Sequence, residues 1–206
     1  MSIQIGKQYF EGFEEKFIPR ANGKGFRKVR VYLGDIYRLE GSDRQWRRKK
    51  ITLACCILAY FGLMVGCGSL RTLANVSVYV MLPYAVGLIS GGYCAMGVWH
   101  CIAAPRDMTV FQYNEQRKQL KNGSRIAACA MAACSASNLI CLILWGLGGQ
   151  LLKGMLAKEL IVLFSNMTCA ALMASIHLLE KKANYILIPG KGSNQSDDWA
   201  ETSAGS

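Results

Sequence analysis

Four long stretches of this 206-residue chain contain no Asp, Glu, Lys or Arg. They cover about residues 51–70, 80–103, 126–147 and 160–179. A helix rises about 1.5 Å per residue, so about 20 apolar residues cross the ~30 Å hydrocarbon core of a bilayer. The pattern predicts an all-α integral membrane protein whose four transmembrane helices form a bundle. Carriers coupled to protons and voltage sensors place an ionisable side chain inside a span, so its absence here argues against both classes.

Catalytic and targeting signatures are also missing. No Ser/His/Asp set, nucleophile elbow or paired carboxylate stands where a site could form, which predicts that the protein is not an enzyme. The glycine-rich segment 146–149 lacks the Lys-Ser/Thr pair that follows in a phosphate loop. The first twenty residues include Glu11, Glu14 and Glu15 and no apolar run of a signal peptide, so insertion is expected to depend on the internal spans.

Cysteine is frequent, but no two cysteines have the CxxC spacing of a metal or redox site. All nine lie inside or at the edge of apolar runs, where cysteine most simply acts as a small packing residue. No disulfide, metal or cofactor is therefore predicted. A soft-metal site is the alternative, because zinc and copper prefer thiolate and imidazole ligands. Its ligands would come from one end of the bundle: Cys55, Cys56, Cys101, Cys129, His100 and His177.

Positive charge is what the chain has in excess, with 24 Lys and Arg against 13 Asp and Glu. Counted in alternate segments between the spans, 21 of the 24 basic residues fall on one side of the membrane. By the positive-inside rule both termini are cytoplasmic, in a plasma membrane or a bacterial inner membrane. The same rule explains the net charge without a nucleic-acid partner. Trp46, Trp99 and Trp145 stand near span ends, as interfacial anchors do.

The densest basic block immediately precedes the first span and consists of Arg47, Arg48, Lys49 and Lys50. Basic residues beside a membrane attract anionic lipid, each contributing about 1 kcal/mol. These four residues are therefore predicted to contact lipid headgroups.

Residues 1–50 are predicted to form a small basic cytoplasmic segment ahead of the bundle of residues 51–180. Phe10, Phe13 and Phe17 recur at helical spacing, which predicts a short amphipathic helix from Gln8 to Phe17. This helix either lies in the headgroup layer or packs on its own segment.

Strand patterns follow this helix. The runs 26–33 and 36–40 alternate in character on either side of Gly34-Asp35, which predicts a β-hairpin. The run 185–189 is a candidate third strand. The tail, residues 181–206, ends in small and acidic residues and is predicted to be disordered there.

Two boundaries are open. Pro83 suits the first turn of a helix, so the second span starts near Pro83 unless a longer helix from Val76 is kinked there. In the loop after this span, Thr109 and Gln112 have the spacing of a capping box and Asn122-Gly123 supplies a stop. These signals predict a separate helix from Val110 to Lys121, either a solvated connector or a helix lying on the membrane.

Small residues are the candidate packing sites within the membrane. Gly62 and Gly66 form one GxxxG pair, and Gly87 and Gly91 form another. Such pairs let helix backbones approach closely where lipid gives no hydrophobic drive for association. The sequence leaves open whether these faces meet within one chain or between chains.

The amides inside the spans are candidates for interhelical hydrogen bonds. Asn138 lies about 18 Å from the start of the third span, at a depth similar to that of Asn166 and Thr168 on the fourth. An amide that faced lipid would be unsatisfied. Asn138 is therefore predicted to hydrogen-bond to Asn166 or Thr168.

These features favour a non-enzymatic accessory or scaffold subunit whose segment 1–50 contacts a cytoplasmic protein partner. The alternative is a small-solute transporter or channel component, working as a homo-oligomer through a pore lined by Ser, Thr, Asn and Gly. Membrane lipids are the other predicted partners.

Overall fold

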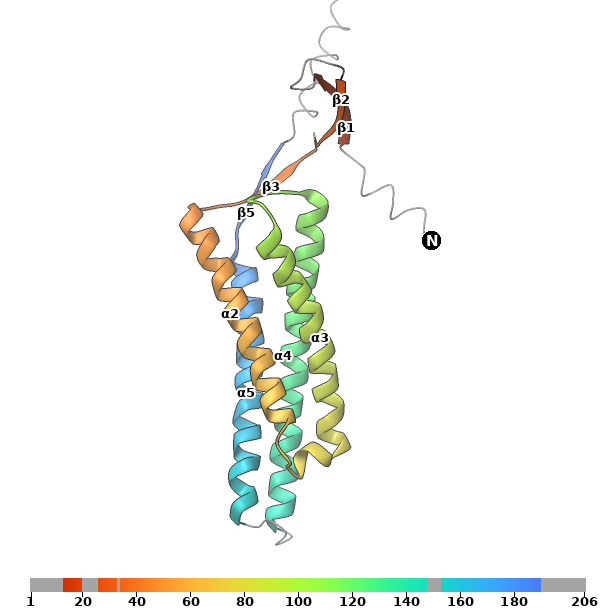
Figure 1. Ribbon diagram of the computed structural model, residues 1–206. Helices are drawn as coiled ribbons and strands as arrows, with labels where there is room; N and C mark the ends of the chain where they lie inside the picture. Colours follow the sequence, from red (N-terminus) through yellow and green to blue (C-terminus); the bar gives the residue numbers. More distant parts are fainter. Residues whose placement is uncertain (1–12, 20–25, 33, 148–152, 190–206) are drawn as a thin grey trace, which may run out of the picture. The chain divides into compact units, whose positions relative to one another are not determined.

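The computed structural model describes residues 13–19, 26–32, 34–147 and 153–189. The chain divides into two compact units, whose elements are labelled in Figure 1. The helical unit comprises residues 41–103 and 115–183. The strand unit comprises the chain up to Glu40, residues 104–114 and the chain from Asn184.

Four long helices dominate the structure: α2 (Asp43–Gly68), α3 (Val78–Ala103), α4 (Val110–Leu147) and α5 (Lys153–Lys182). A short 3₁₀ helix, η1 (Ala74–Val76), lies between α2 and α3. By length and composition all four long helices can cross a membrane, so the predicted four-span class is confirmed. The second, third and fourth predicted spans each lie inside one of these helices, and the first, residues 51–70, extends two residues past the end of α2 at Gly68.

Helix α2 begins well before the predicted span at Ile51 because Ser42 caps it. The Ser42 hydroxyl accepts from the Gln45 backbone N–H at 3.4 Å, and the Gln45 side chain accepts from the Ser42 N–H at 3.2 Å. This reciprocal capping box satisfies two backbone donors at the helix start. The basic block 47–50 is therefore helical, and its side chains point in different directions around α2.

Helix α3 begins at Val78 and contains Pro83 in its interior. A start near Pro83 is therefore wrong, and the helix is the longer alternative with its start at Val78 instead of Val76. Pro83 has no backbone N–H, so one hydrogen bond of the helix is not formed there. The apolar run on both sides of Pro83 keeps the segment helical.

Helix α4 continues through Asn122-Gly123, where a stop was predicted. A Cβ atom on Gly123 would lie 2.9 Å from the backbone N of Cys94, and one on Gly97 would lie 3.0 Å from the backbone N of Leu120. The two glycines thus let α3 and α4 pack backbone to backbone. This packing outweighs the cost of about 1 kcal/mol that glycine carries inside a helix. The helix predicted for residues 110–121 is the first part of one continuous helix.

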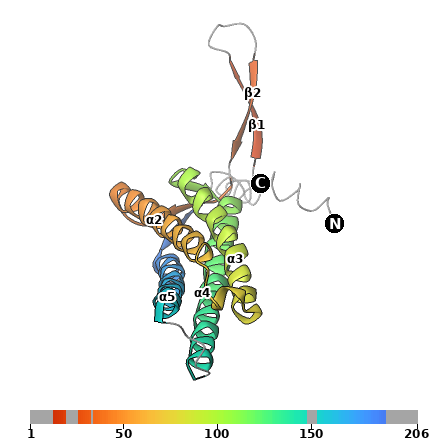
Figure 2. The same ribbon diagram turned by 60° about the horizontal axis from the view of Figure 1, so that its bottom comes forward.

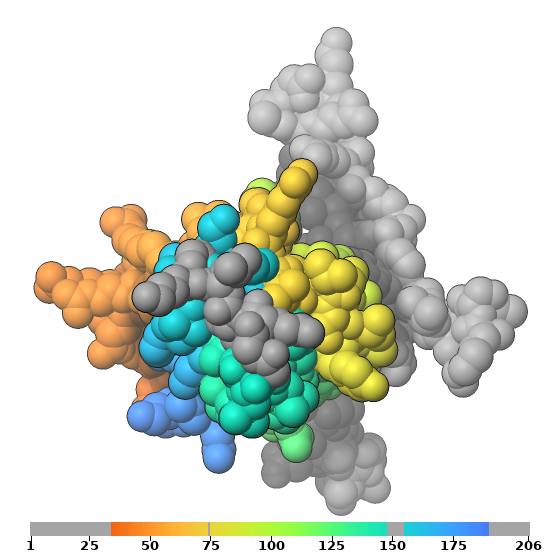
Figure 3. All heavy atoms as spheres, turned by 90° about the horizontal axis from the view of Figure 1, so that it is seen from below, coloured from red at the N-terminus to blue at the C-terminus, as the bar shows by residue number. Residues whose placement is uncertain are grey.

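The bundle interior is filled from all four helices. Tyr60 of α2 is fully buried, and its hydroxyl donates to the Gly87 carbonyl of α3 at 2.7 Å. Viewed along the helices, α4 (teal) lies beside α5 (cyan) and α3 (yellow) in Figure 3. Large apolar side chains such as Leu58, Ile89 and Phe164 remain exposed on the outside of the bundle. Extensive apolar exposure of this kind suits a surface that faces lipid.

Three short strands form one antiparallel sheet in the strand unit, in the order β4 (Asp107–Thr109), β3 (Ile36–Leu39) and β5 (Tyr185–Ile188). The predicted third strand at residues 185–188 is thereby confirmed. Arg38 Nη2 donates to Asp107 Oδ2 across the sheet at 2.7 Å, and Arg38 Nε donates to Oδ1. The hydrogen bond from Arg38 holds the pKa of the Asp107 carboxyl below its ordinary value.

Strands β1 (Phe13–Pro19) and β2 (Phe26–Tyr32) form a separate antiparallel ribbon, labelled in Figure 2. Two predictions are corrected here. From Phe13 onward the predicted amphipathic helix is a strand, while residues 8–12 lie outside the described residues. The run 26–32 pairs with β1 and not with residues 36–39.

The physical reason is an ambiguity in spacing. Phe13 and Phe17 are four residues apart and so share a face of a strand as well as a face of a helix. The strand wins because β2 supplies a complementary partner, with Glu15 directly opposite Arg30.

Candidate functional site

Charged side chains of α2 and α5 and a backbone carbonyl of α3 meet where α2 begins and where α3 and α5 end. Lys49 Nζ lies 2.8 Å from Glu180 Oε2, and the two side chains are only 10% and 1% exposed. Lys50 Nζ donates to the Ile102 carbonyl at 2.9 Å and lies 4.8 Å from the centre of the Trp46 ring. These contacts tie α2 to both α5 and α3. We name this region of the bundle the Lys49 end.

The four predicted headgroup residues are therefore not equivalent. The Lys49 side chain is mostly buried and is paired with Glu180, so it presents less surface to a headgroup than an exposed residue does. Lys50 is half-buried, whereas Arg47 and Arg48 are exposed. Headgroup contact stays a prediction for these two arginines.

Both histidines form hydrogen bonds between helices. His100 Nδ1 on α3 lies 3.0 Å from Gln119 Oε1 on α4, and Gln119 Nε2 donates to Glu115 Oε1 at 2.8 Å. His177 Nδ1 on α5 lies 3.3 Å from the Lys121 carbonyl on α4. These bonds add polar links from α4 to each of its neighbours.

The soft-metal alternative finds no support in the described residues. Within them, no three His, Cys, Asp or Glu side chains gather closely enough to share a metal ion. All nine cysteines are free thiols, and Cys55 and Cys129 are exposed whereas Cys101 is buried. The predicted ligands therefore do not converge.

A buried carboxylate at the opposite end of the bundle was missed by the sequence reading. Glu159 of α5 is fully buried, and its Oε1 accepts from the Leu73 backbone N–H at 2.6 Å. Asn75 Nδ2 in the same link donates to the carbonyls of Cys67 and Leu70 and so caps the end of α2. The signal for Glu159 was its position directly before the apolar run at residue 160. We name this region the Glu159 end.

The two GxxxG pairs have different environments. A Cβ atom on Gly91 would lie 2.5 Å from Tyr60 Cε1, and one on Gly87 would lie 2.7 Å from Met131 Sδ, so this pair is in close contact with side chains of α2 and α4. Among the described residues, no atom outside the local helix backbone lies within 4 Å of a Cβ built on Gly62 or Gly66, so this pair makes no close contact with another described helix. The GxxxG motif places two glycines on one face of a helix, but it does not determine whether that face is turned toward another helix.

The predicted hydrogen bond of Asn138 is not formed. Among the described residues, its buried side-chain oxygen and nitrogen have no hydrogen-bond partner. Asn166 Nδ2 instead donates to Cys134 Sγ at 3.4 Å, and the Thr168 hydroxyl donates to the Phe164 carbonyl at 2.8 Å. Cys134 is four residues, or about 6 Å along α4, from Asn138, so Asn166 lies about one helical turn from the level at which the prediction placed it. Depth alone does not fix how each helix is rotated about its axis.

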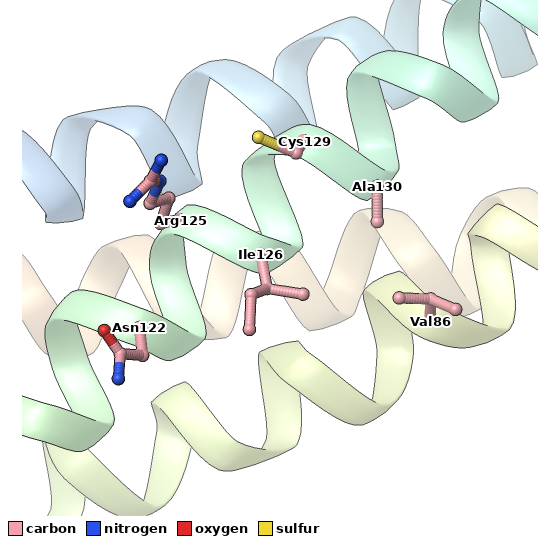
Figure 4. A pocket seen from close by; sticks show the side chains of 6 residues that line it. All are labelled: Val86, Asn122, Arg125, Ile126, Cys129 and Ala130. Atoms are coloured by element: carbon pink, nitrogen blue, oxygen red, sulfur yellow. The ribbon is translucent and has the colours of Figure 1, made fainter.

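An open groove of about 550 Å³ lies along α3 and α4. Its lining residues are Val86, Asn122, Arg125, Ile126, Cys129 and Ala130. Asn122 and Arg125 lie toward one end of the groove, and Val86 and Ala130 lie toward the other (Figure 4). The groove is thus polar at one end and apolar at the other.

No protein-family model, curated protein or solved structure matches this chain.

Proposed function

We propose that the protein is a non-enzymatic accessory or scaffold subunit of a membrane complex and binds a cytoplasmic protein partner through β2. The observation that carries this proposal is the β1–β2 ribbon. Its two seven-residue strands form a sheet of their own. A two-stranded ribbon is at best marginally stable in water, and an added strand from a partner would stabilise it.

The charges on the ribbon indicate the chemistry of that partner. β2 carries three basic and no acidic side chains, whereas β1 carries two acidic and one basic side chain. Opposite charges on adjacent strands are favourable. The outer edge of β2 therefore suits an extended acidic segment of another protein.

The proposal places both termini and the loop between α3 and α4 in the cytoplasm, in a plasma membrane or a bacterial inner membrane. The distribution of Lys and Arg between the spans supports this orientation. The Lys49 end, where α2 begins and α3 and α5 end, is then the cytoplasmic end of the bundle.

We expect site-directed labelling to report this orientation. On a cysteine-free background, a cysteine in place of Ser42 should react with a membrane-impermeant maleimide only from the cytoplasmic side. A cysteine in place of Asn75, in the link between α2 and α3, should react only from the opposite side. Reversed reactivity at either position would contradict the orientation.

The partner proposal predicts that neutral substitutions on β2 weaken a specific complex. The double variant Arg27→Gln/Lys28→Gln should bind the partner about tenfold more weakly than the wild type, because two charged contacts are lost. It leaves Arg30, which opposes Glu15, in place. The measurement is recovery of a stoichiometric partner with the full-length protein from native membranes in mild detergent, with a photo-crosslinker at Val29 to locate the contact.

The matched control is Glu14→Gln/Lys16→Gln, which removes two charges from β1 and should leave recovery unchanged. Equal loss in both variants would contradict a contact at β2. Purification as a homo-oligomer without a foreign chain, with solute conduction in liposomes, would replace the proposal by the transporter or channel alternative.

A further inference from the structure

Contacts between chain segments mark where the apolar layer of the helical unit begins and ends. At the Lys49 end, Lys49 pairs with Glu180 and Lys50 bonds Ile102, which fixes the level of α2, α5 and α3. At the Glu159 end, Glu159 of α5 bonds Leu73, which follows α2. Between these levels α2, α3 and α5 carry no Asp, Glu, Lys or Arg. About twenty residues separate the two levels, which matches the ~30 Å of a hydrocarbon core.

Helix α4 is out of register with this layer. Its Gly123 packs against Cys94, which is eight residues before Ile102, and Arg125 follows two residues later. At about 1.5 Å per residue, the backbone of Arg125 lies about 15 Å from the Lys49 end. Lys121, beside His177, is likewise deeper than Glu180. The basic half of α4 thus runs alongside the apolar halves of its neighbours.

Three basic residues and one amide of this half share one exposed face of α4. Lys118, Lys121, Asn122 and Arg125 follow the i, i+3, i+4, i+7 spacing of one helix face, and all four are exposed. We name them the basic face of α4. Exposed cations at this depth need either water or an anion. Among the described residues, no acidic side chain pairs with Lys118, Lys121 or Arg125.

The groove continues the basic face into the apolar layer. Asn122 and Arg125 belong to both, and beyond them the groove is lined by Ile126, Val86 and Ala130 (Figure 4). Polar and apolar parts therefore follow one another along α4. An amphiphile with an anionic head and an apolar chain matches this order.

We propose that the basic face and the groove bind one anionic phospholipid, with its phosphate on Arg125 and Asn122 and an acyl chain along Ile126 and Val86. A guanidinium can hold two phosphate oxygens at once, which suits Arg125 as the main contact. The basic residues nearer the Lys49 end let the headgroup reach this depth. The site depends on the membrane-spanning helices and is independent of the partner proposed for β2.

Other occupants fit less well. A free phosphate would leave the apolar part of the groove empty. A second copy of this chain has few acids to offer, because those of the described helical unit are already engaged: Asp43, Glu115, Glu159 and Glu180. Two basic faces brought together would repel each other.

The test is native mass spectrometry of the delipidated full-length protein with added dioleoyl-phosphatidylglycerol or dioleoyl-phosphatidylcholine. One phosphatidylglycerol should bind, about fivefold or more tightly than phosphatidylcholine. Arg125→Gln should lower the phosphatidylglycerol affinity by about fivefold, the equivalent of about 1 kcal/mol for a cation near an anionic headgroup. Arg125→Lys should lower the phosphatidylglycerol affinity by less than Arg125→Gln does. Arg44→Gln, which removes an exposed cation from the first turn of α2, should change nothing.

A second variant separates the groove from general surface charge. Cys129→Trp leaves every charge in place and fills the groove beside Ile126, so it should also weaken phosphatidylglycerol binding. Equal affinity for the two lipids would overturn the proposal. So would a Cys129→Trp variant that binds like the wild type, or glycerol phosphate that binds as tightly as the lipid. Circular dichroism of each variant checks that the helices are retained.

Discussion

Replacing Lys49 by methionine is expected to lower the free energy of unfolding by about 3–5 kcal/mol, which makes it the most damaging single change considered. It removes the ammonium group that lies 2.8 Å from Glu180, whose side chain is only 1% exposed. Breaking a buried ion pair from one side leaves the remaining charge poorly compensated, at a cost of about 3–5 kcal/mol. The measurement is unfolding in mixed micelles, followed by circular dichroism.

The double variant Lys49→Met/Glu180→Leu distinguishes loss of the whole ion pair from loss of one charge alone. Replacing both charges of a buried pair by apolar groups is often neutral or stabilising by about 1–4 kcal/mol, so the double variant should recover most of the loss. Arg47→Met is the matched control, because Arg47 is exposed on the same turn of α2 and should change stability by less than about 0.5 kcal/mol. A Lys49→Met variant that unfolded like Arg47→Met would show that the pair is not buried in the membrane.

The second large effect concerns glycine, where packing and helix propensity predict opposite signs. Gly97→Ala/Gly123→Ala should destabilise the bundle, since each new Cβ would stand about 3 Å from the backbone of the facing helix. Overpacking of this kind costs about 1–3 kcal/mol per site, more than the gain of about 1 kcal/mol from alanine in a helix. Because the contact is backbone, no side chain can move aside. Thermal melting in detergent gives the sign directly.

Gly62→Ala/Gly66→Ala is the matched control, because it makes the same two substitutions where the added Cβ atoms meet no close neighbour. No atom stands within 4 Å of either added Cβ, so only the propensity gain remains and stability should rise slightly. If this control lost as much stability as Gly97→Ala/Gly123→Ala, the Gly62–Gly66 face would have to pack closely against another chain. The contrast therefore distinguishes a close helix contact from a lipid-facing surface.

Local sequence was sufficient for the spans because hydropathy over about twenty residues is a property of each segment alone. It was insufficient at Asn122-Gly123. The cost of glycine inside a helix is only about 1 kcal/mol, and the residue that Gly123 packs against, Cys94, is distant in sequence. Local sequence also failed for Phe13 and Phe17, whose spacing suits a strand and a helix equally. The choice there depended on β2.

The candidate sites show the same division. The ion pair of Lys49 joins residues 131 apart in sequence, so no local pattern could assign its partner. For Asn138, local sequence determined neither the rotation of its helix nor its level relative to Asn166 to better than about one turn. Arg125 could be recognised only after contacts between α3 and α4 set their register, because its importance lies in its depth relative to neighbouring helices.

The order of strands in the sheet has a consequence for how the protein is made. β3 leaves the ribosome before any of the four helices, β4 follows only after two of them, and β5 follows after all four. The central strand therefore has both edges unpaired until residues 107–109 are made, and its second edge closes only when residues 185–188 arrive. Exposed strand edges are sites of aggregation and proteolysis. Closure of β5 onto β3 thus requires that all four helices have been made, and a chain truncated before Tyr185 retains an open edge that quality-control proteases can recognise.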